Sequence, residues 1–188
     1  MSTAGTAGAA GTAGAAGTAG TAGAAGAAGV AGAAGVAARE LELILALDTV
    51  PSDRVSALWD SLEPARVDDI AGNRWRGTGL DTGHPMFGML GQMRWWGKDF
   101  TEARKVDPIL VTDDSGEVVP DTSATGGGGA SLWEVSFRGR PTASMVYDRL
   151  PVIDHFAVVG PDTLLAVMNG RGTVHEGEHF WFVLERER

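Results

Sequence analysis

The sequence predicts a mainly β fold of the α+β class. We expect a small antiparallel β-barrel or strongly curled sheet, preceded by one or two N-terminal helices and interrupted by a short helix between strands. Three observations predict it. Short strand-like runs follow one another through the C-terminal half, turn sequences rich in glycine and proline separate them, and helical spacing is confined to earlier segments.

The N-terminal segment is a glycine repeat without charge. From Gly5 to Gly35 every third residue is glycine, and residues 1–38 hold no charged side chain. The repeat lacks the proline that pre-sets the extended backbone of collagen. Because glycine loses much entropy on folding and the tract has no bulky side chains, we expect a disordered extension over residues 1–38. The alternative is a spacer or self-association segment, and residues 39–188 would form a single globular domain.

Three helical segments are expected. Apolar residues recur at near-helical spacing over residues 39–47 and again over residues 53–62. Ser52 is the expected N-cap of the second helix, and Pro64 ends it. The stretch 85–97 carries Met, Leu and Trp side chains at helical spacing despite two glycines, which predicts a short helix or lid between strands.

The strand-like runs account for most of the remaining chain. They occupy residues 74–80, 106–112, 117–119, 132–137, 142–147, 152–159, 163–168 and 179–184. Asp113-Asp114-Ser115-Gly116 is a favourable turn, and Gly126–Gly129 is a loop tip or hinge. Short strands at regular spacing predict a meander closed as a lipocalin-like barrel, and eight closed strands leave room for one small ligand.

Composition argues against several classes of protein. The formal net charge is −9, and all 15 Lys/Arg and 24 Asp/Glu lie beyond residue 38. Such acidity is not typical of proteins that bind nucleic acid or anionic lipid. The chain has no cysteine, which excludes disulfides and thiolate chemistry and is compatible with a reducing cytoplasm. No apolar run is long enough to span a bilayer and no secretory signal is evident, so we expect a cytoplasmic protein.

Several uncommon residues resemble a pair of bacterial modules. The part within residues 53–112 resembles the GXWXG domain, on the motifs Gly72-Asn73-Arg74-Trp75-Arg76-Gly77, Thr82-Gly83-His84-Pro85 and Trp96-Gly97-Lys98. The part within residues 130–188 resembles domain of unknown function 4334 (DUF4334), on Met145–Phe156, Asp162-Thr163-Leu164-Leu165 and the aromatic close at 180–186. The resemblance covers residues 53–188 and implies a compact, mostly β unit that binds a small lipophilic molecule. It implies no catalytic assignment.

Acids, a histidine and apolar residues alternate in two of the predicted strands. Neighbouring strand residues point to opposite faces, so Asp154 and His155 cannot both enter one cavity unless a bulge intervenes. If Asp154 points inward, Phe156 does too; if His155 points inward, Asp154 is its outer partner. The same question applies to Tyr147 and Asp148. An inward Asp among apolar groups would have a raised pKa, fitting a general acid or base. The alternative is a carboxylate that accepts backbone or Arg donors.

A second candidate pair follows the first predicted strand. Asp81 and His84 precede the helix-like segment, a position common for functional groups on loops. The alternative is turn chemistry, with Asp81 capping and Gly83 turning. A metal site from these two residues with Asp154 and His155 has little support, because the spacings typical of metal ligands are missing, and we expect no metal. No nucleotide-binding motif and no Gly-x-Ser-x-Gly elbow occurs, so we expect no cofactor and no serine triad.

The expected function is binding of a small hydrophobic molecule (a lipid, terpenoid or polyketide-like compound) in the barrel. The ligand-binding residues would be Trp75, Trp96 and Phe156 along the cavity and Arg74, Tyr147 and Asp148 at its polar end. Other tryptophan and methionine side chains are either core or cavity lining: Trp95, Trp133, Trp181, Met86, Met89, Met93, Met145 and Met168.

Two other functions stay open. A cofactor-independent enzyme of small-molecule biosynthesis would use Asp154 or Asp81 as acid or base, assisted by His84 or His155, for isomerisation, cyclisation or hydration. Asp148 is a further acidic candidate. A structural or interaction module displayed on the glycine repeat is the third reading, and the oligomeric state is open, a homodimer included.

Overall fold

The computed structural model describes residues 22–188, and residues 1–21 lie outside the described part. The helices are α1 (Ala22–Leu45), α2 (Ser52–Ser61), α3 (Val67–Ile70) and α4 (Met86–Gln92). The strands are β1 (Glu63–Pro64), β2 (Asn73–Gly79), β3 (Trp95–Glu102), β4 (Lys105–Thr112), β5 (Val118–Pro120), β6 (Ala130–Phe137), β7 (Arg140–Tyr147), β8 (Val152–Gly160), β9 (Thr163–Gly170) and β10 (Phe180–Arg186).

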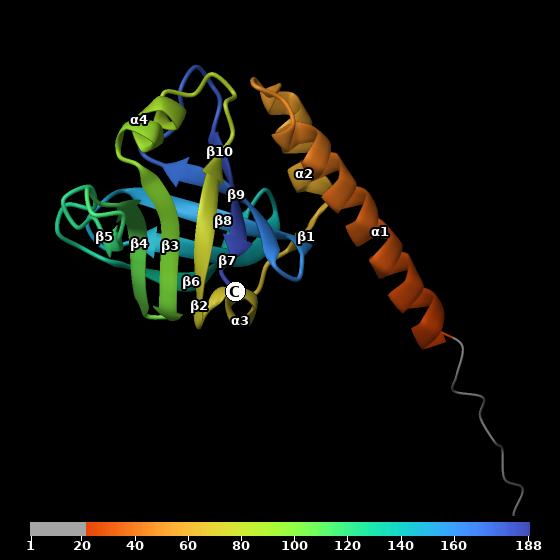
Figure 1. Ribbon diagram of the computed structural model, residues 1–188. Coiled ribbons are helices and arrows are strands. Elements are labelled where there is room, and N and C mark those ends of the chain that lie inside the picture. The colour runs from red at the N-terminus through yellow and green to blue at the C-terminus, as the bar shows by residue number, and fades with distance from the viewer. Residues whose placement is uncertain (1–21) are drawn as a thin grey trace, which may run out of the picture.

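Eight of the strands close into an antiparallel barrel, which confirms the predicted fold class (Figure 1). Neighbouring strands follow the order β8-β7-β6-β4-β3-β2-β10-β9, and the pairing of β8 with β9 completes the ring. The short strand β1 pairs with β8, and β5 pairs with β4. Closure gives each barrel strand a neighbour on both sides, so the sheet has an enclosed interior.

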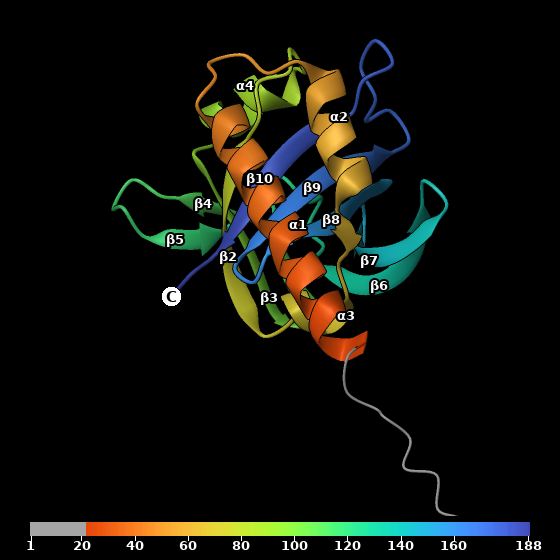
Figure 2. The ribbon, with the colours of Figure 1, turned by 90° about the vertical axis from the view of Figure 1, so that its right-hand side faces the viewer.

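Strand alternation divides the apolar residues into two clusters. Inside the barrel, one cluster includes Phe100, Phe156, Phe180 and Phe182. The second cluster lies on the outer face of β8, β9 and β10, where Trp181 meets the helices α1 and α2. Figure 2 shows these helices lying across that face. The helices therefore cover one outer wall, while α3 and α4 lie at opposite ends of the barrel (Figure 1).

The glycine repeat differs from expectation in its described part. Instead of a disordered extension to residue 38, the chain is helical from Ala22. Alanine has the highest helix propensity, and each glycine costs only about 1 kcal/mol relative to it. The C-terminal turns of α1 bury Ala37, Leu41 and Ile44 against the barrel, which anchors the helix. The expected disorder of residues 1–21 lies outside the described residues.

Two details of the helices also differ. Ser52 is not the N-cap of α2: the cap is Pro51, and the Ser52 hydroxyl donates to the carboxylate of Glu178 instead. The predicted helix over residues 85–97 is confirmed only as α4, because the chain turns at Arg94, whose φ is +54°, and enters β3. Methionine and tryptophan side chains at helical spacing continue across that boundary, so the pattern does not reveal the strand.

Candidate functional site

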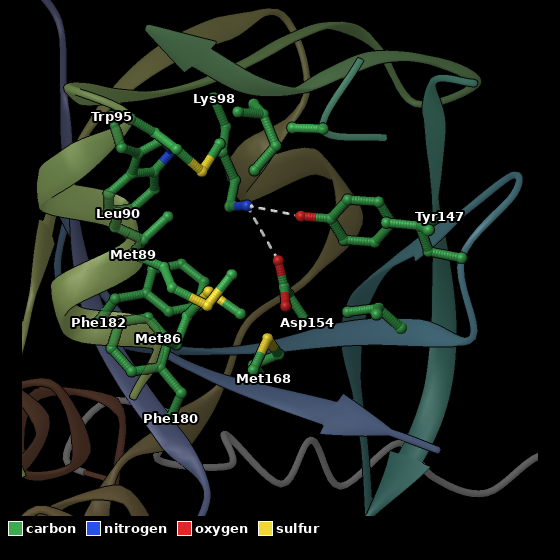
Figure 3. Close-up of a pocket in the computed structure, with 15 residues that line it drawn as sticks. Met86, Met89, Leu90, Trp95, Lys98, Tyr147, Asp154, Met168, Phe180 and Phe182 are labelled. Carbon is green, nitrogen blue, oxygen red and sulfur yellow. Dashed lines mark hydrogen bonds and ion pairs between the residues drawn. The ribbon is translucent and has the colours of Figure 1, made fainter. Parts of the chain in front are cut away.

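The end of the barrel beneath α4 encloses an apolar cavity of about 240 Å³ (Figure 3). Its apolar lining consists of thioether, aromatic and aliphatic groups: Met86, Met89, Leu90, Met93, Trp95, Ile109, Ala124, Leu150, Val152, Met168, Phe180 and Phe182. Three polar side chains complete it, Lys98, Tyr147 and Asp154. The cavity is therefore an apolar chamber with one polar wall.

The polar wall is a buried ion pair. Lys98 Nζ lies 2.9 Å from Asp154 Oδ2, and the two side chains are 2% and 3% exposed. The same nitrogen donates to the Pro108 carbonyl oxygen at 3.0 Å and to the Tyr147 hydroxyl at 3.4 Å. Each of the three N–H donors of the ammonium therefore has an acceptor. The Phe182 ring, centred 5.1 Å away, adds a cation–π contact.

A bulge in β3 points Lys98 into the barrel. The register of β3 against β4 shifts between Trp95 and Gly97, and Gly97 has a φ of +156°. A Cβ at position 97 would overlap the backbone of Trp75, so only glycine fits. The extra residue changes the alternation, so that Trp95 and Lys98 both line the cavity although they are three positions apart.

Asp154 and Tyr147 point inward by regular alternation. Asp154 pairs with Met145 of β7 and with Met168 of β9, so its carboxylate emerges between two methionines. Tyr147 ends β7 and presents its hydroxyl to Lys98 (Figure 3). Burial raises the pKa of Asp154, and the adjacent Lys98 opposes part of that rise. Burial, together with the charge of Asp154, raises the pKa of Tyr147 well above its usual value. The site thus holds a carboxylate that accepts a proton more readily than an exposed one.

Comparison with known proteins assigns the two halves of this barrel. Residues 57–116 match the model of the GXWXG protein family, and residues 128–186 match the model of domain of unknown function DUF4334. The chain is also similar to a protein from Thermomonospora curvata of known crystal structure, with a TM-score of 0.72 and 36% sequence identity over 81% of this chain and 99% of that one. The chain belongs to the GXWXG–DUF4334 family. A comparison with curated proteins gives no match.

The ion pair joins the two family segments. Lys98 comes from the GXWXG segment, whereas Tyr147 and Asp154 come from the DUF4334 segment. The segments are connected through the pairing of β2 with β10 and of β4 with β6. Neither segment alone supplies eight strands or both charges, so the two modules form one barrel and one site.

His155 lies outside the cavity, on the outer face of β8. Its ring stacks on Phe137 with a centroid separation of 4.1 Å, and its nitrogens contact the Ser144 hydroxyl at 2.7 Å and the Asn169 amide at 3.3 Å. Burial, with a smaller contribution from His179, lowers its pKa to about 4. The expectation that His155 assists Asp154 does not agree with this placement, because the two side chains project from opposite faces of β8.

Asp81 and His84 lie beside α4, the helix over the end of the barrel that the sequence pattern predicts as a short helix or lid, rather than in the cavity. Asp81 accepts the Gly83 amide at 3.1 Å, which is the turn chemistry weighed as the alternative. His84 Nδ1 accepts the Met86 amide, and His84 Nε2 bonds the Thr173 carbonyl oxygen, both at 3.1 Å. Burial lowers the pKa of His84. The histidine thus tethers the first turn of α4 to the β9–β10 loop.

Of the six expected ligand-binding residues, only Tyr147 reaches the cavity. Trp75 and Phe156 are buried in the inner core cluster but do not line the cavity: Trp75 donates from Nε1 to the Ile70 carbonyl oxygen of α3, and Phe156 packs edge-on against Phe100. Arg74 and Trp96 lie on the outer surface, with the guanidinium 4.9 Å from the indole centroid. Asp148, also expected at the site, is exposed and accepts the Gly129 amide at 3.1 Å.

Strand alternation alone does not predict that Lys98 is a site residue, because its inward position depends on the bulge at Gly97. The glycine between Trp96 and Lys98 is the signal that could have indicated it. Of the methionine and tryptophan side chains expected in either the core or the cavity lining, Met86, Met89, Met93, Met168 and Trp95 line the cavity, whereas Met145 and Trp181 belong to the core. Within residues 22–188 no three His, Asp or Glu side chains gather as metal ligands, and no helix there is long and apolar enough to cross a membrane.

Proposed function

We propose that the protein binds a small hydrophobic molecule inside the barrel, with the polar end of the molecule beside Lys98, Tyr147 and Asp154. The observation that carries this proposal is an apolar cavity closed at one wall by a buried ion pair. Burying an ion pair costs free energy that a fully apolar interior would avoid, and this cost supports a functional role for the pair. An apolar pocket with a few convergent polar groups is the usual form of a small-molecule site.

The cavity volume limits the size of the ligand. At about 240 Å³ it lies between an engineered cavity of about 150 Å³ that binds benzene and the smaller natural ligand pockets of about 300 Å³. A monoterpenoid or a comparably compact ketone or alcohol fits this range better than a long-chain lipid. The methionines of α4 and β9 suit such a ligand, because their flexible side chains adapt to irregular shapes.

Titration calorimetry with citronellol, menthone and geraniol tests the proposal. A Val152→Trp variant fills the cavity from β8, and we expect it to weaken binding at least tenfold. Ile153→Trp is the matched control, because the neighbouring position on the same strand does not line the cavity. Equal binding by both variants would place the ligand elsewhere, and no binding to the wild-type protein would contradict the proposal.

Acid–base catalysis in the same cavity is the second candidate. It is favoured by the raised pKa of Asp154 beside two groups, Lys98 and Tyr147, that can stabilise charge on a substrate oxygen. For a ketone such as menthone, the Asp154 carboxylate would take the proton from the carbon next to the carbonyl. Once the enolate has turned over in the cavity, Asp154 would return the proton to its opposite face, giving isomenthone without a cofactor. Gas chromatography would detect the epimer. Turnover that is lost in Asp154→Asn while menthone binding survives would favour the enzyme; no turnover by the wild-type protein would favour binding alone.

A further inference from the structure

The charges of the cavity are already balanced before any ligand enters. Lys98 and Asp154 are the two charged side chains in its described lining, and they neutralise each other at 2.9 Å. Both are almost completely buried, so solvent cannot screen a third charge placed beside them.

We propose that this pair makes the cavity selective for electrically neutral ligands, such as alcohols and ketones, and that Asp154 is the residue that excludes carboxylates. The inference rests on the proposed function and specifies its ligand class. A ligand hydroxyl can donate to Asp154 and a ligand carbonyl can accept from Tyr147. Neither contact changes the net charge of the buried site.

A ligand carboxylate meets a different environment. It would have to share one ammonium with Asp154, and the N–H donors of Lys98 already serve Pro108, Tyr147 and Asp154. The site would then hold one positive and two negative charges away from water, which is strongly unfavourable. Such a ligand could enter only with a proton, taken up either by itself or by Asp154. His155, the titratable side chain next to Asp154 in the sequence, points outward from β8 and does not reach the cavity.

Citronellol and citronellate test the selectivity, since they share one carbon skeleton and differ in charge. By calorimetry near neutral pH, we expect the wild-type protein to bind citronellol at least tenfold more tightly. Titrations in buffers of different ionisation enthalpy should show about one proton taken up with each citronellate and none with citronellol. Citronellate that binds as tightly as citronellol without proton uptake would overturn the inference.

Removal of the negative charge gives the second test. Asp154→Asn leaves Lys98 as the single charge of the cavity, so we expect the preference to shift toward citronellate by at least tenfold and the proton uptake to disappear. Asp148→Asn, on the outside of the same barrel, should keep the wild-type preference.

An unchanged preference in Asp154→Asn contradicts the inference; if this variant does not fold, proton uptake by the wild-type protein still decides. Failure of both probes to bind any folded form contradicts the proposed function itself, whereas equal binding of both contradicts only the selectivity.

Discussion

The indole of Trp95 lies against Gly77 so closely that a Cβ at position 77 would overlap the ring. Trp95 also donates from Nε1 to the Gly97 carbonyl oxygen at 3.0 Å, and its ring packs edge-on against Phe182. Two glycines on adjacent strands therefore shape the wall of the cavity. Gly77 leaves space for the indole, and Gly97 forms the bulge that points Lys98 inward.

We expect Gly77→Ala to destabilise the fold by about 1–3 kcal/mol, in the range of other overpacked cores. The indole can relieve the overlap only by moving toward the cavity, so citronellol binding should weaken as well. Urea denaturation and calorimetry measure the two effects. Gly88→Ala is the control: a Cβ there meets no atom within 4 Å, and alanine favours the helix. Unchanged stability and affinity in Gly77→Ala would contradict this account of Trp95.

The buried ion pair should show strong coupling between its partners. We expect Lys98→Met or Asp154→Leu alone to cost about 3–5 kcal/mol, because each leaves a buried charge without its counter-charge. The double variant Lys98→Met/Asp154→Leu should recover most of that loss, since an apolar pair of similar volume packs without charge. Urea denaturation of the four proteins gives the coupling energy. Additive losses in the double variant would show that the pair does not act as a unit.

His155 should make the folded state sensitive to mild acid. Above pH 6.5 the ring is neutral in both folded and unfolded chains, so its contribution to stability is complete. As pH falls from 6.5 toward about 4, the unfolded chain takes up a proton that the buried ring does not, which lowers stability by about 3 kcal/mol.

His155→Gln should flatten this dependence. Because the pKa of Asp154 is raised in the folded state, this residue makes the fold more stable as pH falls, which is opposite to the effect of His155. The difference between the wild-type and variant unfolding free energies from pH 7 to pH 4 isolates the histidine. Parallel pH profiles for the two proteins would contradict a buried, neutral His155.

The tether at His84 should control opening of the lid. We expect His84→Ala to release the first turn of α4 from Thr173, increasing amide hydrogen exchange in α4 and speeding citronellol dissociation several-fold. Asp81→Asn, which keeps an oxygen for the Gly83 amide, should change neither. Exchange in α4 that is the same in His84→Ala and the wild-type protein would show that the lid is held by other contacts.

The barrel itself could be predicted, because strand length, turn residues and alternation all carry the same signal. Alternation also limited the polar candidates to two assignments, Asp154 inside or His155 inside. It could not choose between them, because both faces of β8 are buried: one by the cavity and the other by Phe137 and the helices. Which of the two side chains points inward depends on which outer face of the barrel the helices cover, and this is set by tertiary contacts that the strand pattern does not contain.

The inward position of Lys98 and the surface position of Trp96 could not be read from the same pattern. Arg74 could, because it neighbours the inward Trp75 in β2 and alternation puts the two side chains on opposite faces. Regular alternation places every second residue of a strand on one face, and the bulge at Gly97 breaks that rule within a single strand. The run of methionines and tryptophans before it also continues a helical spacing into β3. Local periodicity therefore fails at the segment that supplies the positive charge of the site.

A crystal structure of the protein with citronellol tests the central claim most directly. We expect ligand density beneath α4, with the hydroxyl oxygen within hydrogen-bond distance of Tyr147 or Asp154 and the hydrocarbon among the methionines. An interior filled by those side chains, with the ligand bound on the outer surface or not bound, would contradict it.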